Sequence, residues 1–345
     1  MADLLTDNNC LNLVRIIAAF QVMLGHLLEH LELQGNETLF RITYFLRGVP
    51  IFFVISGYLI WISAARSKSF AQYLKKRFWR IYPELWMAVI IEIIVLVILY
   101  HSWNIKQLVL FGFGQGTVLQ FWTPECLRGY GVGTPNGALW TIGVMVQFYI
   151  IVWFFYGRIK NQKIITWCAG FAVSFAVSWG GGYITRELIG KEIIGKIYDQ
   201  TFIKYFWIFY IGMFIARFQD RIIPILQRYW HVLLAAAFFF FWTGWDLFSG
   251  YYLLWSLFMA SGVIGFAYRF PQLSISLDFS YGLFLYHMTV VNVFVNFGWT
   301  GSWLYVIPVM LISSLFACLS ALTAGRTSAV RKHQIIQNDY TGGKK

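Results

Sequence analysis

The chain has 345 residues, of which 59% are hydrophobic and only 12% are charged. A soluble globular domain is excluded, because repeated apolar runs approach the roughly 20 residues that a membrane-spanning helix needs. We attribute the formal net charge of +12 to membrane topology and contact with anionic lipid rather than to nucleic-acid binding.

The first apolar run predicts a transmembrane helix that is retained in the protein. We do not expect a cleaved signal peptide, because no basic n-region precedes this run and no small-residue cleavage site follows it. Nine further apolar runs predict an all-α, polytopic integral membrane protein with about ten transmembrane helices. The predicted spans are residues 12–31, 43–64, 83–101, 138–157, 163–180, 203–217, 229–247, 251–268, 278–298 and 302–324.

Basic residues gather in the segments between alternate predicted spans. These segments are residues 66–80, 157–163, 216–228, 268–270 and 325–333. The positive-inside rule places them, and both termini, in the cytoplasm. The last span is followed by a polar cytoplasmic tail, residues 325–345, so we expect one membrane domain over residues 1–345 without a fused second domain.

Two ionisable side chains, Arg15 and His26, interrupt the first predicted span. Eleven residues at about 100° and 1.5 Å each amount to three turns, so both side chains leave one helix face about 16 Å apart. An ionisable group inside a membrane is costly and belongs by default to a functional site. The pair therefore predicts a polar cavity along this helix.

A basic and aromatic stretch precedes the third predicted span. Its pattern predicts an interfacial amphipathic helix that feeds a span beginning at Pro83. Arg77 and Arg80 lie on one face and can bind a phosphate or pyrophosphate through paired charge-assisted hydrogen bonds. We assign Tyr82 to the same cofactor-binding segment. The alternative is an inside-positive anchor, which nearly every membrane protein has.

Five features of the chain together resemble the membrane acyltransferase-3 family. They are Arg15 with His26, GVPIFFVISGYLI at 48–60, RFWRIYP at 77–83, ALWTIGVMVQFYI at 138–150 and DFSYGLFLYHMTV at 278–290. Their order and spacing match the family along essentially the whole chain. The chain resembles the stand-alone members of this family, which have no fused extracytoplasmic domain.

The resemblance implies a bacterial inner-membrane enzyme that moves an acyl group, commonly acetyl, from cytoplasmic acyl-CoA to a hydroxyl of a cell-surface or lipid-linked glycan. His26 would be the general base, or the carrier of an acyl-imidazole. Arg77 and Arg80, helped by Arg15, would hold the CoA phosphates. The implied partners are acyl-CoA, the glycan, membrane lipids and a separate extracytoplasmic transferase, with no nucleic acid.

The chain departs from the family at one position. In the family's W-[ST]-[LI]-x-V-E-x-Q-F-Y segment an acid follows the valine, whereas Met145 follows Val144 here. A thioether can neither orient an imidazole nor balance a buried arginine. Three readings stay open: an inactivated variant, a natural protein with relaxed chemistry, or a position that never needed the acid.

Further residues are expected to support the site. Glu29, one turn beyond His26, is a candidate to orient that imidazole. His287 falls where the family also has a histidine, and it is either a hydrogen-bonded structural group or part of donor or acceptor binding. The motifs also supply Trp140, Gln147 and Tyr281.

Two rival functions remain. A transporter or flippase would use the same cavity to pass a lipid-linked sugar or acyl group without chemistry. Residues 26–30, HLLEH, also match the H-x-x-E-H motif of inverted zinc peptidases. No second acidic motif follows on a helix, so we expect no metal cofactor.

The segment 102–137 is rich in glycine and aromatic residues and is predicted to be a long outer loop. It has two interpretations, a mobile lid for a sugar acceptor or an aromatic belt at the membrane interface.

Overall fold

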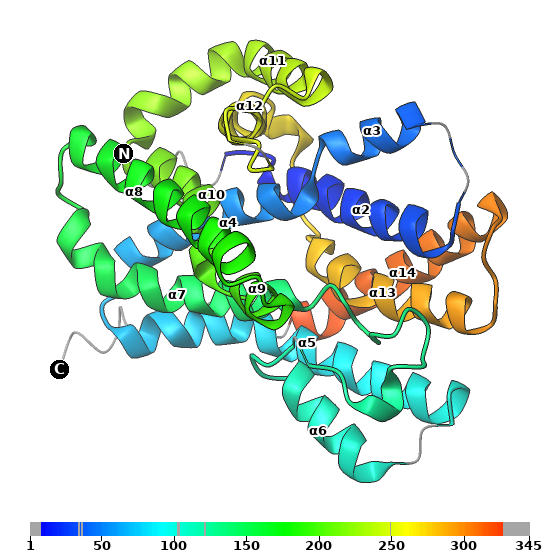
Figure 1. Cartoon of the computed structure of the whole chain (residues 1–345). Helices are drawn as coiled ribbons and strands as arrows, with labels where there is room; N and C mark the ends of the chain where they lie inside the picture. Colours follow the sequence, from blue (N-terminus) through cyan, green and yellow to red (C-terminus); the bar gives the residue numbers. More distant parts are fainter. Residues whose placement is uncertain are drawn as a thin grey trace. The chain divides into compact units, whose positions relative to one another are not determined.

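The structure, a computed structural model, describes residues 8–33, 35, 37–101, 104–120, 122–248 and 250–326. This part of the chain is helical and contains no strand, which confirms the all-α prediction for it. Most of the predicted polar tail lies outside the described residues. The α-helices, labelled in Figure 1, are α2 (Leu11–His30), α3 (Glu37–Phe45), α4 (Gly48–Ala65), α5 (Phe70–Leu99), α6 (Ile105–Gln115), α7 (Trp140–Ile159), α8 (Ile164–Tyr183), α9 (Glu192–Tyr198), α10 (Phe202–Arg217), α11 (Gln219–Thr243), α12 (Leu253–Arg269), α13 (Ser280–Asn296) and α14 (Val306–Ser320). Short 3-10 or π turns are η1 (Glu125–Leu127), η2 (Ile184–Leu188), η3 (Pro271–Leu273), η4 (Trp303–Tyr305) and η5 (Ala321–Gly325).

Seven helical stretches of the described chain are long and apolar enough to cross a membrane. They are Leu11–His30, Glu37–Ala65, Phe70–Leu99, Trp140–Ile159, Ile164–Leu188, Gln219–Thr243 and Trp303–Gly325. The three other predicted spans fall on α10, α12 and α13, which have 16, 17 and 17 residues. The total of ten spans and the cytoplasmic termini therefore stay predictions.

Helix α5 does not begin at Pro83. It runs unbroken for 30 residues from Phe70, and the hydroxyl of Ser69 caps its start by accepting the backbone N–H of Gln72 at 3.2 Å. The residue of α5 at which the membrane span starts stays a prediction. The helix continues through Pro83 because a proline removes only one helical hydrogen bond. Ending the helix there would leave several backbone groups without partners in an apolar environment.

The predicted outer loop 102–137 contains more regular structure than the sequence suggested. It forms α6 and the short turn η1. A buried apolar cluster joins these elements to α5, and its members are Leu96, Leu108, Phe111, Leu127 and Tyr130. Burial of five such side chains holds this part of the segment against α5.

The chain divides into two compact units, and each is built from stretches that are far apart in the sequence. Unit 1 comprises the described residues of Met1–Ala18, Arg41–Arg66 and Gln147–Ser276. Unit 2 comprises those of Ala19–Phe40, Ser67–Val146 and Leu277–Lys345. Helix α2 begins in unit 1 and ends in unit 2, so Arg15 belongs to the first and His26 to the second. The prediction of a single domain stays a prediction.

Two glycines bring α4 and α10 into backbone contact in unit 1. A Cβ atom added to Gly57 would overlap the carbonyl oxygen of Phe209, and one added to Gly212 would overlap that of Val54. Small residues allow membrane helices to approach this closely. The glycine of the FFVISGY motif therefore has a packing role.

We expect Gly212→Ala to destabilise the protein by about 1–3 kcal/mol, because the added methyl group must push two helices apart. Thermal unfolding in detergent measures this effect. Gly157→Ala is the matched control, since a Cβ there meets no atom within 4 Å. Equal melting temperatures for the two variants would contradict the close-packing argument.

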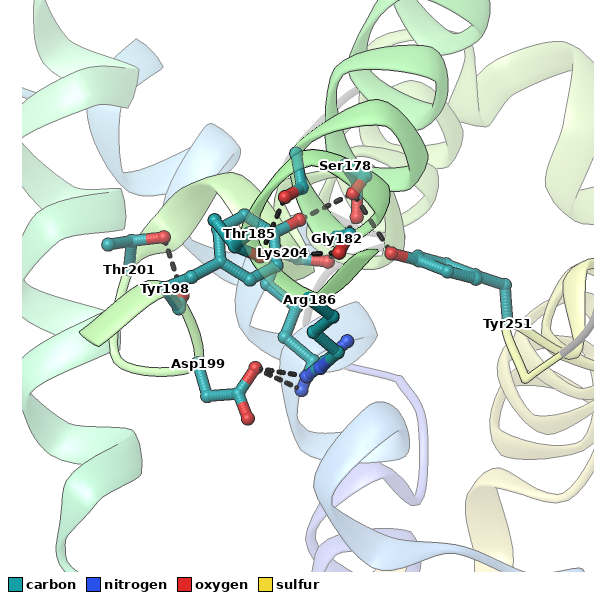
Figure 2. A network of polar contacts seen from close by, with 10 residues as sticks. Ser178, Gly182, Thr185, Arg186, Tyr198, Asp199, Thr201, Lys204 and Tyr251 are labelled. Atoms are coloured by element: carbon teal, nitrogen blue, oxygen red, sulfur yellow. Dashed lines mark hydrogen bonds and ion pairs between the residues drawn. The ribbon is translucent and has the colours of Figure 1, made fainter. Parts of the chain in front are cut away.

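A polar network connects α8, α9 and α10 in unit 1 (Figure 2). The Asp199 carboxylate accepts from Arg186 at 2.6 Å and from Lys204 at 2.7 Å. The Ser178 carbonyl accepts from the hydroxyls of Tyr198 and Tyr251. Burial raises the pKa of the Tyr198 phenol, so it stays protonated and donates. These bonds order the connection between α8 and α10.

Candidate active site

Three histidines of unit 2 lie together, two from α2 and one from α13. The ring centroids of His26 and His287 are 5.2 Å apart, with their planes inclined at 29°. The ring of His30, one helical turn further along α2, lies 5.4 Å from that of His26. His287 is completely buried, and the other two rings are half-buried. The structure thus joins His26 and His287, which are 261 positions apart in the sequence.

The contacts of His287 define which of its nitrogens carries the proton. Its Nδ1 lies 2.9 Å from the carbonyl oxygen of Leu283. A carbonyl oxygen only accepts, so Nδ1 must be the protonated donor. In a neutral ring Nε2 then keeps a lone pair, and this buried atom has no hydrogen-bond partner among the described residues. The ring presents an unused acceptor inside the protein.

His26 has a hydrogen-bond partner on its own helix. Its Nδ1 lies 3.3 Å from Nε2 of His30, four residues later, so one of these nitrogens donates to the other. Glu29, which we expected to orient His26, is exposed. The hydrogen-bond partner that the structure shows for the imidazole is His30, and the orienting role of Glu29 stays a prediction.

Arg80 of α5 is held against the start of α13. Its guanidinium donates to Asp278 Oδ2 at 3.0 Å and lies 5.8 Å from the ring centre of Tyr281. The other oxygen of Asp278 accepts from the backbone N–H and hydroxyl of Ser280 at 3.2 and 2.6 Å. The hydroxyl of Tyr281 donates to the carbonyl of Ile81 at 3.2 Å. The DFSYG motif therefore fixes the position of one arginine.

The other predicted cofactor-binding residues lie in different surroundings. Arg77 is half-buried one turn before Arg80, about 60° round the helix from it. Tyr82 faces about 200° from Arg80. Its ring packs against Phe78 and Trp86, with centroids 4.9 and 5.8 Å away. Their binding roles stay predictions.

The predicted residues of α7 fall on either side of the boundary between the units. Trp140, the first residue of the helix, and Met145 belong to unit 2 and are half-buried. Gln147 belongs to unit 1, where its amide donates to the carbonyl of Gln200 at 3.0 Å and accepts the N–H of Phe202 at 2.9 Å. Gln147 thus supports the start of α10.

Helix α13 contacts three other segments of unit 2. Tyr281 contacts α5, His287 contacts α2, and Asn292 contacts the segment before α7. These positions follow one another by about 9 and 7.5 Å along the helix axis. The buried amide of Asn292 accepts the N–H of Val132 at 2.8 Å. It also donates to the carbonyls of Thr134 and Pro135 at 3.0 and 2.7 Å.

We expect Asn292→Ala to destabilise the protein by about 3 kcal/mol, because it removes three hydrogen bonds and leaves one buried and two half-buried backbone groups unpaired. Chemical or thermal unfolding in detergent measures the loss. Asn296→Ala, one turn further along α13 and only half-buried, is the control. The amide network is not important for stability if both variants unfold alike.

Sequence reasoning missed two residues of this site. His30 enters the sequence analysis through the HLLEH motif alone, although its i+4 spacing from His26 is the available signal for a contact. Asp278 was part of the quoted DFSYG motif, but no pattern pointed to its partner, Arg80, 198 positions away.

Comparison with known proteins gives a family and two similar chains. The family model described as "Acyltransferase domain" matches residues 8–323. Nodulation protein 10 of Rhizobium leguminosarum bv. viciae is 27% identical over 323 residues, covering 86% of each chain. An O-acetyl transferase of Shigella phage Sf6 is 26% identical over 333 residues, covering 89% of this chain and 91% of the phage protein. No solved structure matches the chain.

Proposed function

This chain belongs to the acyltransferase-3 family, and we propose that it transfers an acyl group from cytoplasmic acyl-CoA to a hydroxyl of a cell-surface or lipid-linked glycan. The observation that carries the proposal is the group of three histidines around His26. This group provides an oriented imidazole with the nitrogen lone pairs of two other imidazoles beside it, in a chain that belongs to an acyltransferase family. That is what base-assisted acyl transfer to a hydroxyl needs.

The base is Nε2 of His26. For this nitrogen to accept a proton, Nδ1 of the neutral ring must carry one and donate it to Nε2 of His30, across the observed 3.3 Å. Histidine bases commonly have a hydrogen-bond partner on the other ring nitrogen, which fixes the tautomer in this way. We therefore assign an orienting role to His30.

In the transfer step, Nε2 of His26 takes the proton of the acceptor hydroxyl. At the same time the hydroxyl oxygen bonds to the thioester carbonyl carbon. The carbon–sulfur bond breaks, and the imidazolium returns the proton to the departing sulfur, which leaves as the CoA thiol. In the covalent variant Nε2 of His26 attacks the thioester carbonyl carbon and the CoA thiolate leaves. The acceptor oxygen then bonds to the acyl carbon and displaces the imidazole, and its proton passes to the thiolate.

His287 supports this step from the buried side. Its ring packs on His26 and limits the orientations that the base can adopt. Its Nε2 lone pair can also accept a hydrogen bond from a sugar hydroxyl. Both effects favour a hydroxyl acceptor placed beside His26.

Donor binding is assigned to the cytoplasmic side of α5. Arg77 and Arg80 supply guanidinium groups for the CoA phosphates, and Asp278 keeps the second of them in place. Arg15 precedes His26 by about 16 Å on the same helix and assists the donor. The name of the phage relative, an O-acetyl transferase, supports acetyl as the acyl group.

We place the protein in the bacterial inner membrane. The acceptor is then reached directly, or through a separate extracytoplasmic transferase that receives the acyl group. Membrane lipids surround the apolar helices. No metal is needed for this reaction scheme.

The decisive test is acyl transfer by the purified protein. Radiolabelled acetyl-CoA and a polysaccharide acceptor are incubated with this chain and, in parallel, with Met145→Glu, which restores the family's acid. We expect a labelled ester. The enzyme proposal is wrong if neither protein forms one.

Transport is the second candidate, because Met145 replaces an acidic residue that the family's chemistry uses. A transporter would move a labelled lipid-linked sugar across a vesicle membrane without forming an ester. The same protein preparation, reconstituted in vesicles, distinguishes these two outcomes.

A further inference from the structure

Three side chains with potential metal-ligand atoms lie together at the C-terminal end of α2. One atom from each of His26, Glu29 and His30 lies within 4.8 Å of the others. Among the described residues, this is the group of histidine, cysteine and acidic side chains that is close enough to hold a metal ion. The acyl-transfer scheme uses the two histidines but gives no role to Glu29.

The spacing of the two imidazoles fits a transition metal. Zinc binds imidazole nitrogen at about 2.0–2.1 Å in tetrahedral sites, which places two ligand atoms about 3.4 Å apart. His26 Nδ1 and His30 Nε2 are separated by 3.3 Å. The two rings can therefore accept an ion between them without a change in the helix. The exposed carboxylate of Glu29 has the rotational freedom to complete a third bond.

A third imidazole lies beside this group. The buried Nε2 of His287 keeps a lone pair that no described residue uses, and its ring lies against that of His26. From the grouping of the three ligand atoms and the spacing of the two imidazole nitrogens, we propose that His26, Glu29 and His30 form a binding site for a divalent transition-metal ion, best matched by zinc.

The ion would be an inhibitor of acyl transfer and not its cofactor. A metal on Nδ1 of His26 leaves the ring proton on Nε2, so that nitrogen can no longer accept the proton of a hydroxyl. Acyl transfer requires the opposite tautomer, with the proton on Nδ1. Metal binding and transfer are therefore mutually exclusive. This consequence rests on the proposed function, whereas metal binding itself does not.

Binding is tested with cobalt(II), which has visible absorption bands in a tetrahedral site. The whole protein in lipid nanodiscs is titrated with cobalt chloride, and zinc chloride is then used to displace the cobalt. We expect one equivalent per chain, and an affinity at least about tenfold lower in Glu29→Gln and in His30→Gln. Because Glu29 is exposed, its substitution does not threaten folding.

The matched control is His231→Gln, which removes an exposed histidine of α11 and should leave the cobalt spectrum unchanged. The proposal is overturned if His30→Gln and Glu29→Gln bind cobalt as tightly as the unchanged protein, or if no tetrahedral spectrum appears.

Inhibition is measured separately, as the zinc concentration that halves acyl transfer. We expect it to equal the zinc dissociation constant from cobalt displacement. Cobalt binding without any acyl transfer would support the metal site and contradict the proposed function. Transfer that continues at saturating zinc would overturn the inhibitory role.

Discussion

A His26→Gln variant is expected to lose about 100- to 10,000-fold in kcat for acyl transfer, the usual contribution of a general base. Glutamine retains a polar group of similar reach but cannot take a proton from the acceptor hydroxyl. The measurement is steady-state transfer of radiolabelled acetyl from acetyl-CoA to the glycan acceptor. KM for acetyl-CoA should change little, because the phosphates are assigned to the arginines of α5.

The control for this variant is His231→Gln, which changes an exposed histidine of another helix. Its kcat should match that of the unchanged protein. If transfer continues undiminished in His26→Gln, another group is the base. Rapid quenching of the unchanged protein distinguishes the two mechanisms, since only the covalent variant leaves label on His26.

The double variant Arg77→Ala, Arg80→Ala is expected to bind acyl-CoA at least about 100-fold more weakly. Each charge-assisted hydrogen bond contributes about 1.5–3 kcal/mol, and two such losses exceed a factor of 100. Equilibrium binding of a non-hydrolysable acetyl-CoA analogue measures the change. Lys75→Ala, an exposed cation on the same helix, is the control for a general loss of positive charge.

Arg80 also has a structural contact, so its two roles must be separated. Asp278→Asn weakens the ion pair with Arg80 while leaving both arginines in the protein. We expect less than about a tenfold loss of CoA affinity, since the guanidinium keeps its charge. A loss as large as that of the double variant would show that position, and not phosphate binding, explains the effect of Arg80.

The family motifs are explained in large part by packing. The glycine of FFVISGY admits the backbone of α10 beside α4. In DFSYG, the added Cβ of Gly282 would meet Ala317 of α14 at 2.7 Å, so this glycine joins α13 to α14. Tyr281 and Asp278 of the same motif hold α5. The sequence could identify these positions but not the helices that they contact.

Local sequence patterns do not determine where every helix begins or which side chain contacts His26. A proline commonly marks a helix boundary, yet Pro83 lies inside α5 because the long apolar segment continues the helix through it. Glu29 has the right spacing to reach His26, but helix spacing alone does not distinguish an exposed carboxylate from a half-buried imidazole. His30 has nearly the same spacing and makes the hydrogen bond to His26 that the structure shows.

The sequence by itself determined that the chain is helical, apolar enough for a membrane and related to acyltransferases. It also placed Arg15 and His26 on one face, because the helical repeat is fixed by the backbone. The tertiary structure decided that His287 stacks on His26 and that Asp278 holds Arg80. Such contacts depend on which faces of distant helices pack together, and a local repeat contains no information about that choice.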